Sequence, residues 1–313
     1  MKNKISNRFL AGILLAAVLF AFSLDAYGQN TAVKNETSQT ASKSAVAIQD
    51  LKLESRLMAR AMPYRVILPA RYDFNKSERF PVVYLLHGLT GHFDNWADKT
   101  KLKDFASGYQ YIVVMPEGEN GWYTDSATAP NDKYESYIAR ELVAEIDKKF
   151  RTIPDKNRRA IAGLSMGGYG SLKFGLKYPE MFSLVGSFSG ALQAASFTDK
   201  MLGNNWKVLT DSIMSVYAAE GSQTRRENDI YKIVREMPAE KIKNLPFIYL
   251  DCGTEDGLIA SNREFSALLL ERKIPHEFRQ LPGRHDWVFW NSQIREFFDL
   301  SERFLQPAPA KAD

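Results

Sequence analysis

Short apolar runs alternate with longer amphipathic stretches along most of the chain. Residues 80–86 and 111–115 are almost wholly apolar, which predicts strands buried on both faces. Residues 134–150 carry apolar side chains at helical spacing, which predicts a helix. By the same signs, strands are expected at 159–163, 182–188, 245–252 and 276–281, and helices at 168–178, 260–272 and 286–305. This alternation predicts an α/β fold, with a mostly parallel central sheet and helices on both faces.

Two segments depart from this alternation. In residues 51–68, polar and apolar positions interleave, which predicts two strands at an antiparallel start of the sheet. Residues 191–243 contain no regular alternation and predict a small insertion above the carboxyl end of the sheet, where open α/β sheets bind ligands. We expect one catalytic domain over residues 46–306 and a flexible tail at 307–313.

The N-terminus has the layout of an export signal. Residues 1–8 are basic, and residues 9–24 are almost wholly apolar. Ala26 and Gly28 are small residues at positions −3 and −1 of a cut before Gln29. This pattern predicts a secreted or periplasmic protein, and the alternative is an uncleaved membrane anchor.

We therefore expect a signal peptide at residues 1–28. The following residues 29–45 are rich in Thr, Ser, Asn and Lys and lack aromatic side chains, which predicts a disordered linker. After cleavage, no stable membrane insertion is expected.

The composition narrows the classes of function. Hydrophobic residues make up 45% and charged residues 25% of the chain, as in an ordinary folded protein. A single cysteine excludes a disulfide framework, and four histidines leave little material for a metal site. The formal net charge is +4, of which residues 1–28 carry +2, so nucleic acid is not an expected partner. We expect neither a metal nor an organic cofactor, and the sequence leaves the oligomeric state open.

The sequence Gly163-Leu-Ser165-Met-Gly167 lies between a predicted strand and a predicted helix. In that setting, G-x-S-x-G indicates a nucleophile elbow, a sharp turn that exposes the serine hydroxyl. The backbone N–H of Met166, next to the nucleophile, is then expected to donate to an oxyanion. The alternative is a glycine-rich turn needed only for packing between helix and strand.

A serine nucleophile needs a general base, and in this arrangement the acid and then the histidine follow the serine along the chain. Only His276 and His285 follow Ser165. His276 opens a predicted strand, whereas His285 lies in a loop after the last strand, where an imidazole can reach the serine. We therefore favour His285 as the base.

The acid is expected at the end of the strand predicted over residues 245–252. Glu255 and Asp256 both lie in the following turn, and the residue pattern does not separate them. Asp251 lies inside the strand and ranks third. The acid would hold the imidazole tautomer and stabilise the imidazolium.

The sequence His87-Gly88-Leu89 follows the first buried strand. Glycine at this point lets a backbone N–H face the site, so the N–H of Leu89 is the second expected oxyanion donor. His87 precedes the serine in the chain, and its expected role is to orient this loop. His92 is interpreted as a solvated loop residue.

Several motifs together resemble the putative-esterase branch of the α/β-hydrolases, with its tributyrin-type esterases, S-formylglutathione hydrolases, feruloyl and acetylxylan esterases and antigen 85 mycolyltransferases. The motifs are Leu85-Leu-His87-Gly-Leu89-Thr-Gly91, Gly163-Leu-Ser165-Met-Gly-Gly-Tyr169-Gly, Cys252-Gly-Thr-Glu-Asp256 and His285-Asp-Trp. The resemblance implies an α/β-hydrolase fold. It also implies Ser165, Asp256 and His285 as the triad, with Leu89 and Met166 as oxyanion donors, and so favours Asp256 over Glu255.

The sequence around Trp122 and Tyr123 is similar to the loop beside the acyl pocket in this family, so these rings are expected to line the pocket, with aromatic packing as the alternative.

The leading hypothesis is a secreted serine carboxylesterase that forms an acyl-enzyme. Residues 191–243 are too often interrupted by charges to form a lipase lid, so short-chain or aromatic acyl esters are expected as substrates, including esters on carbohydrates. One alternative is an acyltransferase of the antigen 85 type that uses the same triad. Another is a non-catalytic binding protein with a hydrolase fold.

Overall fold

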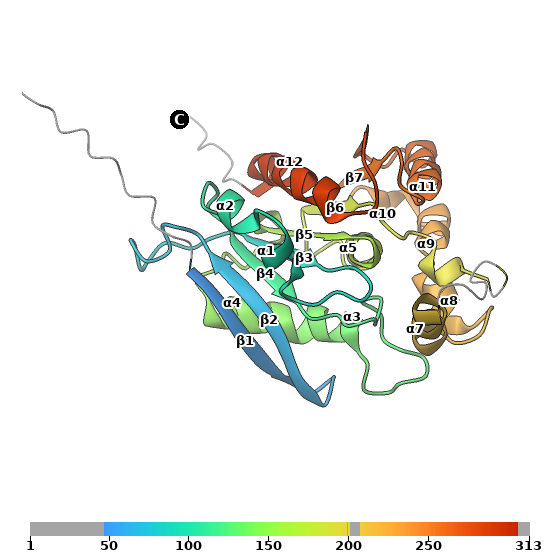
Figure 1. Ribbon diagram of the computed structural model, residues 1–313, viewed down its shortest axis with the longest axis horizontal. Helices are drawn as coiled ribbons and strands as arrows, with labels where there is room; N and C mark the ends of the chain where they lie inside the picture. The colour runs from blue at the N-terminus through green and yellow to red at the C-terminus, as the bar shows by residue number, and fades with distance from the viewer. Residues whose placement is uncertain (1–46, 199, 201–206, 306–313) are drawn as a thin grey trace, which may run out of the picture. The chain divides into compact units, whose positions relative to one another are not determined.

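The computed structural model describes residues 47–198, 200 and 207–305. The expected signal peptide (1–28), linker (29–45) and tail (307–313) lie outside these residues. Within the described part, the strands form one eight-stranded sheet in the order β1-β2-β4-β3-β5-β6-β7-β8 (Figure 1). The strands are β1 (Ala47–Ser55), β2 (Arg60–Leu68), β3 (Val82–Leu86), β4 (Ile112–Pro116), β5 (Arg159–Leu164), β6 (Leu184–Phe188), β7 (Phe247–Gly253) and β8 (His276–Leu281).

The sheet is antiparallel at one edge and parallel elsewhere. β1 pairs with β2, and β2 with β4, in antiparallel register. The pairs from β4 through β3, β5, β6 and β7 to β8 are all parallel. The structure thus confirms the mostly parallel sheet and the antiparallel start predicted from residues 51–68.

The apolar strands separate two hydrophobic cores. In β3, Val82, Tyr84 and Leu86 belong to one core, whereas Val83 and Leu85 belong to the other. Successive side chains of a strand point to opposite faces, so an uninterrupted apolar run is what a strand covered on both faces requires.

Helices supply the other side of each core (Figure 1). One face is covered by α1 (Asn95–Lys99), α2 (Leu102–Ala106) and α12 (Trp287–Leu305). The opposite core includes residues of α3 (Tyr134–Ser136), η1 (Tyr137–Leu142), α4 (Val143–Lys149), α5 (Met166–Lys177), α9 (Ile230–Glu236) and α11 (Ile259–Glu271). The aromatic residues of α12 pack on the sheet, with Phe297 and Phe298 fully buried.

The helix predicted over residues 134–150 contains a π-helical segment, η1, between α3 and α4. Glu141 in η1 accepts hydrogen bonds from the backbone N–H groups of Arg56 (3.1 Å) and Leu57 (3.3 Å), in the turn between β1 and β2. The wider turn therefore coincides with the point where this helix holds the antiparallel edge of the sheet.

The segment 191–243 follows β6 and is helical in its described part. It contains η3 (Ala194–Ser196), α7 (Lys207–Tyr217), α8 (Gln223–Asn228), α9 and α10 (Ala239–Ile242). Ile213, Tyr217, Ile230 and Val234 bury their side chains in the same core as α5. Over residues 47–198, 200 and 207–305, no helix has the length and apolar character needed to cross a membrane.

The only cysteine of the chain, Cys252, lies in β7 and is fully buried. Burial, together with the nearby charge of Asp256, raises the pKa of its thiol to about 12. At neutral pH this thiol is therefore protonated and shielded from solvent.

Candidate active site

Ser165 stands between the end of β5 and the first turn of α5. Its φ of 52° and ψ of −114° lie outside the usual regions for a side-chain-bearing residue. The backbone holds this strain in place, because the N–H of Ser165 donates to the carbonyl of Phe188 (2.9 Å) and its carbonyl accepts from Tyr169 (3.1 Å) and Ala191 (3.0 Å). This is the local geometry that a nucleophile elbow requires.

Glycine is needed on both sides of this serine. A Cβ atom on Gly163 would lie 2.5 Å from the backbone of Gly167, and one on Gly167 would lie 2.4 Å from the carbonyl oxygen of Leu86. Neither neighbour is a flexible side chain that could move away. The two glycines therefore let α5 begin directly against β3 and β5.

Ser165, His285 and Asp256 form a continuous hydrogen-bonded chain. The distance between His285 Nε2 and Ser165 Oγ is 3.0 Å, and that between His285 Nδ1 and Asp256 Oδ2 is 2.8 Å. A proton on Nδ1, donated to the carboxylate, leaves Nε2 free to accept the serine proton. About a third of the His285 side chain is exposed, whereas that of Asp256 is fully buried.

The environment of Asp256 keeps this carboxyl ionised. Burial alone would raise its pKa, but the hydrogen bonds from His285 and from the N–H of Leu258 (2.8 Å) outweigh burial. The pKa of Asp256 is therefore lowered below its ordinary value.

The other residues weighed from the sequence have different partners. Glu255 pairs with Arg284 at 3.0 Å on the surface. Asp251 is fully buried, and within the described residues its carboxylate oxygens have no hydrogen-bond partner, so burial holds its pKa well above the ordinary value. His276 contacts Ser266 Oγ at 2.9 Å on the outer strand β8. None of these side chains joins the chain of contacts from Ser165.

Aromatic side chains at the start of α12 hold the His285 ring. The Trp290 ring meets the imidazole edge to face, with 5.0 Å between the centroids. Trp287 packs against Trp290 at 5.2 Å, and the ammonium of Lys99 lies 5.3 Å from the Trp287 ring centroid. The sequence pattern predicted a helix over residues 286–305 and did not identify Trp287 and Trp290 as site residues.

Two backbone N–H groups beside Ser165 remain available. The loop after β3 passes close to the serine, since a Cβ on Gly88 would lie 3.4 Å from Ser165 Cβ. Met166 is the first residue of α5, where a backbone N–H has no partner inside the helix. Among the hydrogen bonds found in the described residues, none uses the N–H of Leu89 or Met166. These are the two groups that the sequence predicts as donors to a bound oxygen atom.

A buried contact between His87 and Glu117 lies beneath this loop. His87 Nδ1 donates to the carbonyl of Gly88 (2.8 Å), and Nε2 lies 3.0 Å from Glu117 Oε1. The carbonyl of Gly88 and the N–H of Leu89 belong to the same peptide plane, so fixing one also fixes the direction of the other. His87 thus lies where the sequence predicts an orienting contact.

Glu117 was not identified from the sequence. Burial would raise its pKa, but the hydrogen bond and charge of His87 lower it to about 2. His92 Nδ1 lies 3.1 Å from the second carboxylate oxygen of Glu117, so His92 is more than the solvated loop residue expected from the sequence. The feature of the sequence that could have identified Glu117 is its position directly after the buried strand β4.

Trp122 and Tyr123 belong to the core, and neither lies on the wall of the cavity beside Ser165. Both side chains are almost fully buried, and both residues have positive φ angles of about 50°. The Trp122 indole donates to Ser212 Oγ in α7 (3.0 Å), and the Tyr123 hydroxyl donates to the carbonyl of His87 (2.9 Å). These rings connect the loop after β4 to its neighbours, which corresponds to the packing alternative weighed from the sequence.

A cavity of about 230 Å³ opens beside Ser165. Its walls come from the loop after β3, from α1, from α12 and from the segment 191–243: Gly88, Leu89, Thr90, Gly91, Asn95, Lys99, Leu164, Ser165, Val208, His285, Trp287 and Trp290. The side chain of Val208, in α7, is the contribution of the segment 191–243 to this wall. In the described parts of the chain, no group of three or more His, Cys, Asp or Glu side chains is arranged to hold a metal ion.

The chain matches known proteins over most of its length. Residues 55–298 match the family described as "Putative esterase". An acetyl esterase of Caldicellulosiruptor saccharolyticus is 30% identical over 81% of this chain and 97% of its own. A ferulic acid esterase structure has a TM-score of 0.69 at 30% identity and covers 83% of this chain and 99% of its own. A fluorophosphonate-binding serine hydrolase of Staphylococcus aureus has a TM-score of 0.72 at 25% identity and covers 82% and 98%. The fold is an α/β-hydrolase fold, and the chain belongs to the putative esterase family and is a carboxylesterase.

Proposed function

We propose that this protein is a secreted serine carboxylesterase that uses Ser165 as nucleophile, His285 as general base and Asp256 as the acid of a catalytic triad. The observation that carries the proposal is the continuous contact from Ser165 Oγ through the His285 ring to a buried, ionised Asp256. The strained backbone of Ser165 at the start of α5 supports the same assignment.

The proposed reaction has two halves. The serine oxygen attacks the ester carbonyl carbon while His285 Nε2 takes the serine proton, and the collapse of the tetrahedral intermediate breaks the bond to the alcohol. His285 returns the proton to the departing alcohol and leaves an acyl-Ser165. Water then gives a proton to His285 and attacks the acyl carbon. The bond between the acyl carbon and Ser165 Oγ breaks, and His285 returns the proton to Oγ, which releases the acid and the free serine.

The negative oxygen of each intermediate would be stabilised by the backbone N–H groups of Leu89 and Met166. Met166 begins a helix of 12 residues, whose N-terminus adds a favourable partial positive charge. Asp256 stabilises the imidazolium that forms in both halves and does not take its proton.

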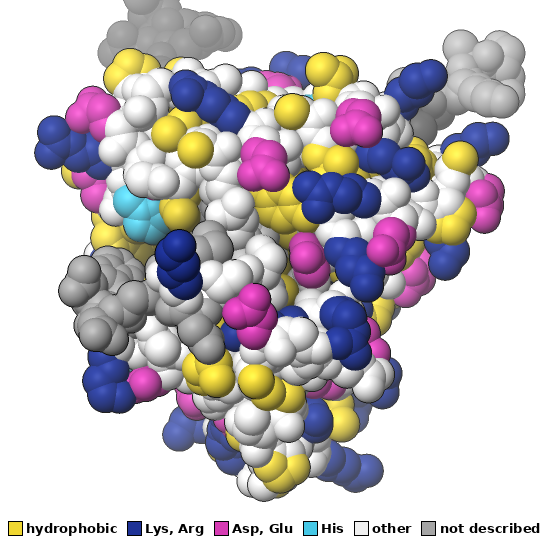
Figure 2. Space-filling view, turned by 90° about the vertical axis from the view of Figure 1, so that its right-hand side faces the viewer, with side chains coloured by type: hydrophobic (Ala, Val, Ile, Leu, Met, Phe, Trp, Pro, Cys, Tyr) yellow, Lys and Arg dark blue, Asp and Glu magenta, His cyan; other side chains and the backbone are white. Residues whose placement is uncertain are grey.

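We propose short-chain or planar aromatic acyl groups as substrates, including those esterified to carbohydrates. The cavity beside Ser165, at about 230 Å³, is smaller than the roughly 300–1,000 Å³ typical of drug-sized ligand sites. Figure 2 shows the face that carries α7, α8 and α9, where described acidic and basic side chains intermingle and apolar side chains form only small groups. A lipase surface would instead need a broad apolar area. The acetyl esterase and ferulic acid esterase relatives agree with this choice.

Two measurements on one pair of proteins test the function. Ser165→Ala should lower kcat for p-nitrophenyl acetate by ~10⁴-fold or more and remove labelling by a fluorophosphonate, while circular dichroism stays unchanged. Activity within tenfold of the wild type, or a label on another residue, would exclude Ser165 as the nucleophile.

The acyl preference has its own test. Values of kcat/KM for p-nitrophenyl esters from acetate to palmitate should peak among the short chains, because each added CH₂ contributes its ~0.8 kcal/mol only where the cavity has room. A maximum at palmitate with activation at an oil–water interface would indicate a lipase. Comparing acetate release from acetylated xylan with ferulate release from a feruloyl sugar distinguishes the two acyl classes.

A further inference from the structure

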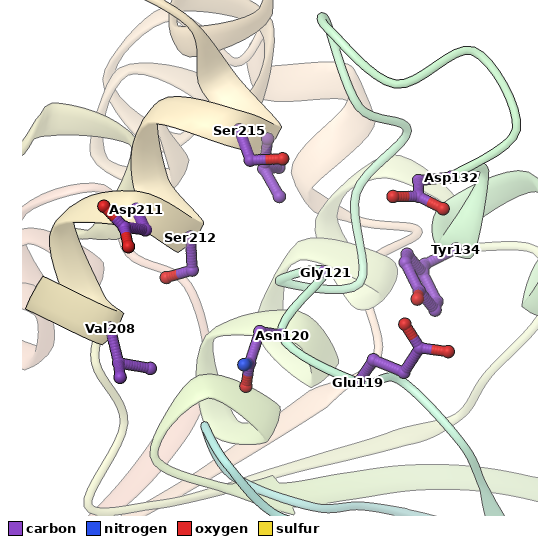
Figure 3. A pocket seen from close by; sticks show the side chains of 10 residues that line it. Glu119, Asn120, Gly121, Asp132, Tyr134, Val208, Asp211, Ser212 and Ser215 are labelled. Atoms are coloured by element: carbon purple, nitrogen blue, oxygen red, sulfur yellow. The ribbon is translucent and has the colours of Figure 1, made fainter.

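A second and larger cavity, of about 370 Å³, lies beside the first. Figure 3 shows its two walls, with α7 on one side and the loop after β4 and the start of α3 on the other. Its lining residues are Glu119, Asn120, Gly121, Asp132, Tyr134, Val208, Asp211, Ser212, Ser215 and Val216. We call this cavity the acidic pocket.

The acidic pocket adjoins the cavity at Ser165. Val208 lines both cavities, and this residue is 48% exposed. The N–H of Thr90, which lines the cavity at Ser165, donates to Asn120 Oδ1 of the acidic pocket at 2.8 Å. The part of a substrate that projects from the cavity at Ser165 on the Val208 side would therefore meet the acidic pocket.

The lining of the acidic pocket carries negative charge. Glu119, Asp132 and Asp211 contribute carboxylates, and no lysine or arginine is among the described residues that line it. Arg60 pairs with Glu119 (3.5 Å) and Asp132 (3.0 Å), and Lys207 pairs with Asp211 (2.5 Å), but both cations stand outside the lining. Three carboxylates against two cations leave the pocket negative and rich in hydrogen-bond acceptors.

We infer that the acidic pocket binds the alcohol portion of the ester and selects alcohols that carry no negative charge. This inference rests on the proposed esterase function and adds the class of alcohol to it. A neutral alcohol with hydroxyl groups can donate to the carboxylates, and a cationic alcohol is attracted to them, whereas an anionic alcohol or thiol is repelled.

The two cavities differ in polarity, as do the acyl group and the alcohol of such an ester. The cavity at Ser165 presents Leu89, Leu164 and the rings of Trp287 and Trp290, which suit an apolar acyl group. Among the described residues that line it, Lys99 is the one lysine or arginine. The acidic pocket presents carboxylates, an amide and hydroxyl groups. The acidic pocket would therefore make polar contacts to the alcohol, and the cavity at Ser165 would make apolar contacts to the acyl group.

The test uses three acetates that differ only in the end of the alcohol. They are acetylcholine, which is cationic, its neutral isostere 3,3-dimethylbutyl acetate, and the anionic 2-acetoxyethanesulfonate. At low ionic strength, kcat/KM should be about tenfold lower for the anionic than for the neutral ester and highest for the cationic ester, and the differences should shrink in high salt. A second series keeps the alcohol fixed and compares p-nitrophenyl pentanoate with the anionic p-nitrophenyl hemiglutarate.

Variants locate the source of the charge effect. In Glu119→Gln/Asp211→Asn, the ratio of neutral to anionic acetate turnover should fall from about tenfold toward one. Glu240→Gln removes an exposed carboxylate of α10 and should leave the ratio unchanged. An unchanged ratio in the double variant, or a penalty for the anionic acyl ester in place of the anionic alcohol ester, would overturn the inference.

The outcome is separable from the proposed function. Turnover of p-nitrophenyl acetate and fluorophosphonate labelling of Ser165 report esterase chemistry in the same protein samples. If both persist and the three acetates are hydrolysed equally well, the esterase proposal stands and the acidic pocket does not bind the alcohol.

Discussion

Asp256 and Glu255 are adjacent carboxylates in very different surroundings. The side chain of Asp256 is fully buried beneath His285, whereas that of Glu255 is 55% exposed and pairs with an exposed arginine. Exposed pairs of this kind contribute roughly 0–1 kcal/mol, whereas a buried acid fixes the tautomer of its histidine.

We therefore expect Asp256→Asn to lower kcat by ~10⁴-fold, because the amide can donate to the imidazole and favour the wrong tautomer. Glu255→Gln should stay within about threefold of the wild type. Steady-state kinetics with p-nitrophenyl acetate on both variants makes the comparison, and a larger loss in Glu255→Gln would reverse the assignment of the acid.

The sequence predicts the proposed nucleophile, the proposed base and the short turn that contains the proposed acid, because each follows a recognisable strand. It could not separate Glu255 from Asp256, since the choice depends on which carboxyl faces the imidazole. It also missed Trp287, Trp290 and Val208 as lining residues. An apolar side chain fits the same periodic pattern whether it faces a core or a cavity, and only the packing of α7 and α12 against the sheet decides between them.

At the scale of elements, the start of α5 depends on a contact between a helix backbone and a strand backbone. Gly167→Ala would place a Cβ 2.4 Å from the carbonyl of Leu86, so α5 or β3 must shift. We expect a loss of about 1–3 kcal/mol in the free energy of unfolding and much weaker fluorophosphonate labelling.

Gly108→Ala is the matched control, because its Cβ would meet only the carbonyl of Phe105 at 3.4 Å, an ordinary contact. Urea unfolding of both variants gives the comparison. Equal stability of the two would show that the close approach of α5 to β3 is not needed.

The loop that carries Leu89 is held by the contact between His87 and Glu117, and the Glu117 carboxyl gives a pH dependence. Burial opposes ionisation of Glu117, but His87 lowers its pKa to about 2, below the value of 4.5 for the free side chain. A folded-state pKa below the unfolded one means that the pair stabilises the fold above about pH 4.5, and that this contribution is lost as the pH falls toward 2.

An NMR titration of the Glu117 carboxyl carbon tests this prediction directly. Its carbon chemical shift, assigned by its disappearance in Glu117→Gln, should stay constant from pH 7 to pH 4, where an ordinary glutamate is already largely protonated. A midpoint at or above pH 4.5 would mean that His87 does not stabilise the charged carboxylate.

The elements themselves were largely predictable, and the exceptions have physical causes. Every strand from β3 to β8 was expected within a few residues of its position. The π-helical segment η1 was not, because one wider turn leaves the apolar spacing of residues 134–150 almost unchanged. The order of strands in the sheet was also not predicted, since it depends on which crossovers pack best and not on any one segment.

For the whole molecule, the main untested expectation concerns export. The basic start, the apolar residues 9–24 and the small residues Ala26 and Gly28 lead us to expect an exported protein that begins near Gln29. Intact-mass measurement of protein recovered from outside the cytoplasm decides this. A mass that retains residues 1–28 would instead indicate an enzyme held at the membrane by its N-terminus.

The buried thiol of Cys252 provides a way to measure how often the folded molecule opens. Only a thiolate reacts quickly with a disulfide reagent. In the folded protein the pKa of about 12 keeps the Cys252 thiol protonated, and its buried position in β7 keeps the reagent away. The sulfur is fully buried on β7, between β6 and β8, so exposing it requires the structure around β7 to open. With one cysteine in the chain, each molecule can be marked only once. When the reagent is concentrated enough to modify the thiol faster than the fold recloses, the rate of that single modification equals the rate of opening around β7, and it measures kinetic lifetime without any introduced label.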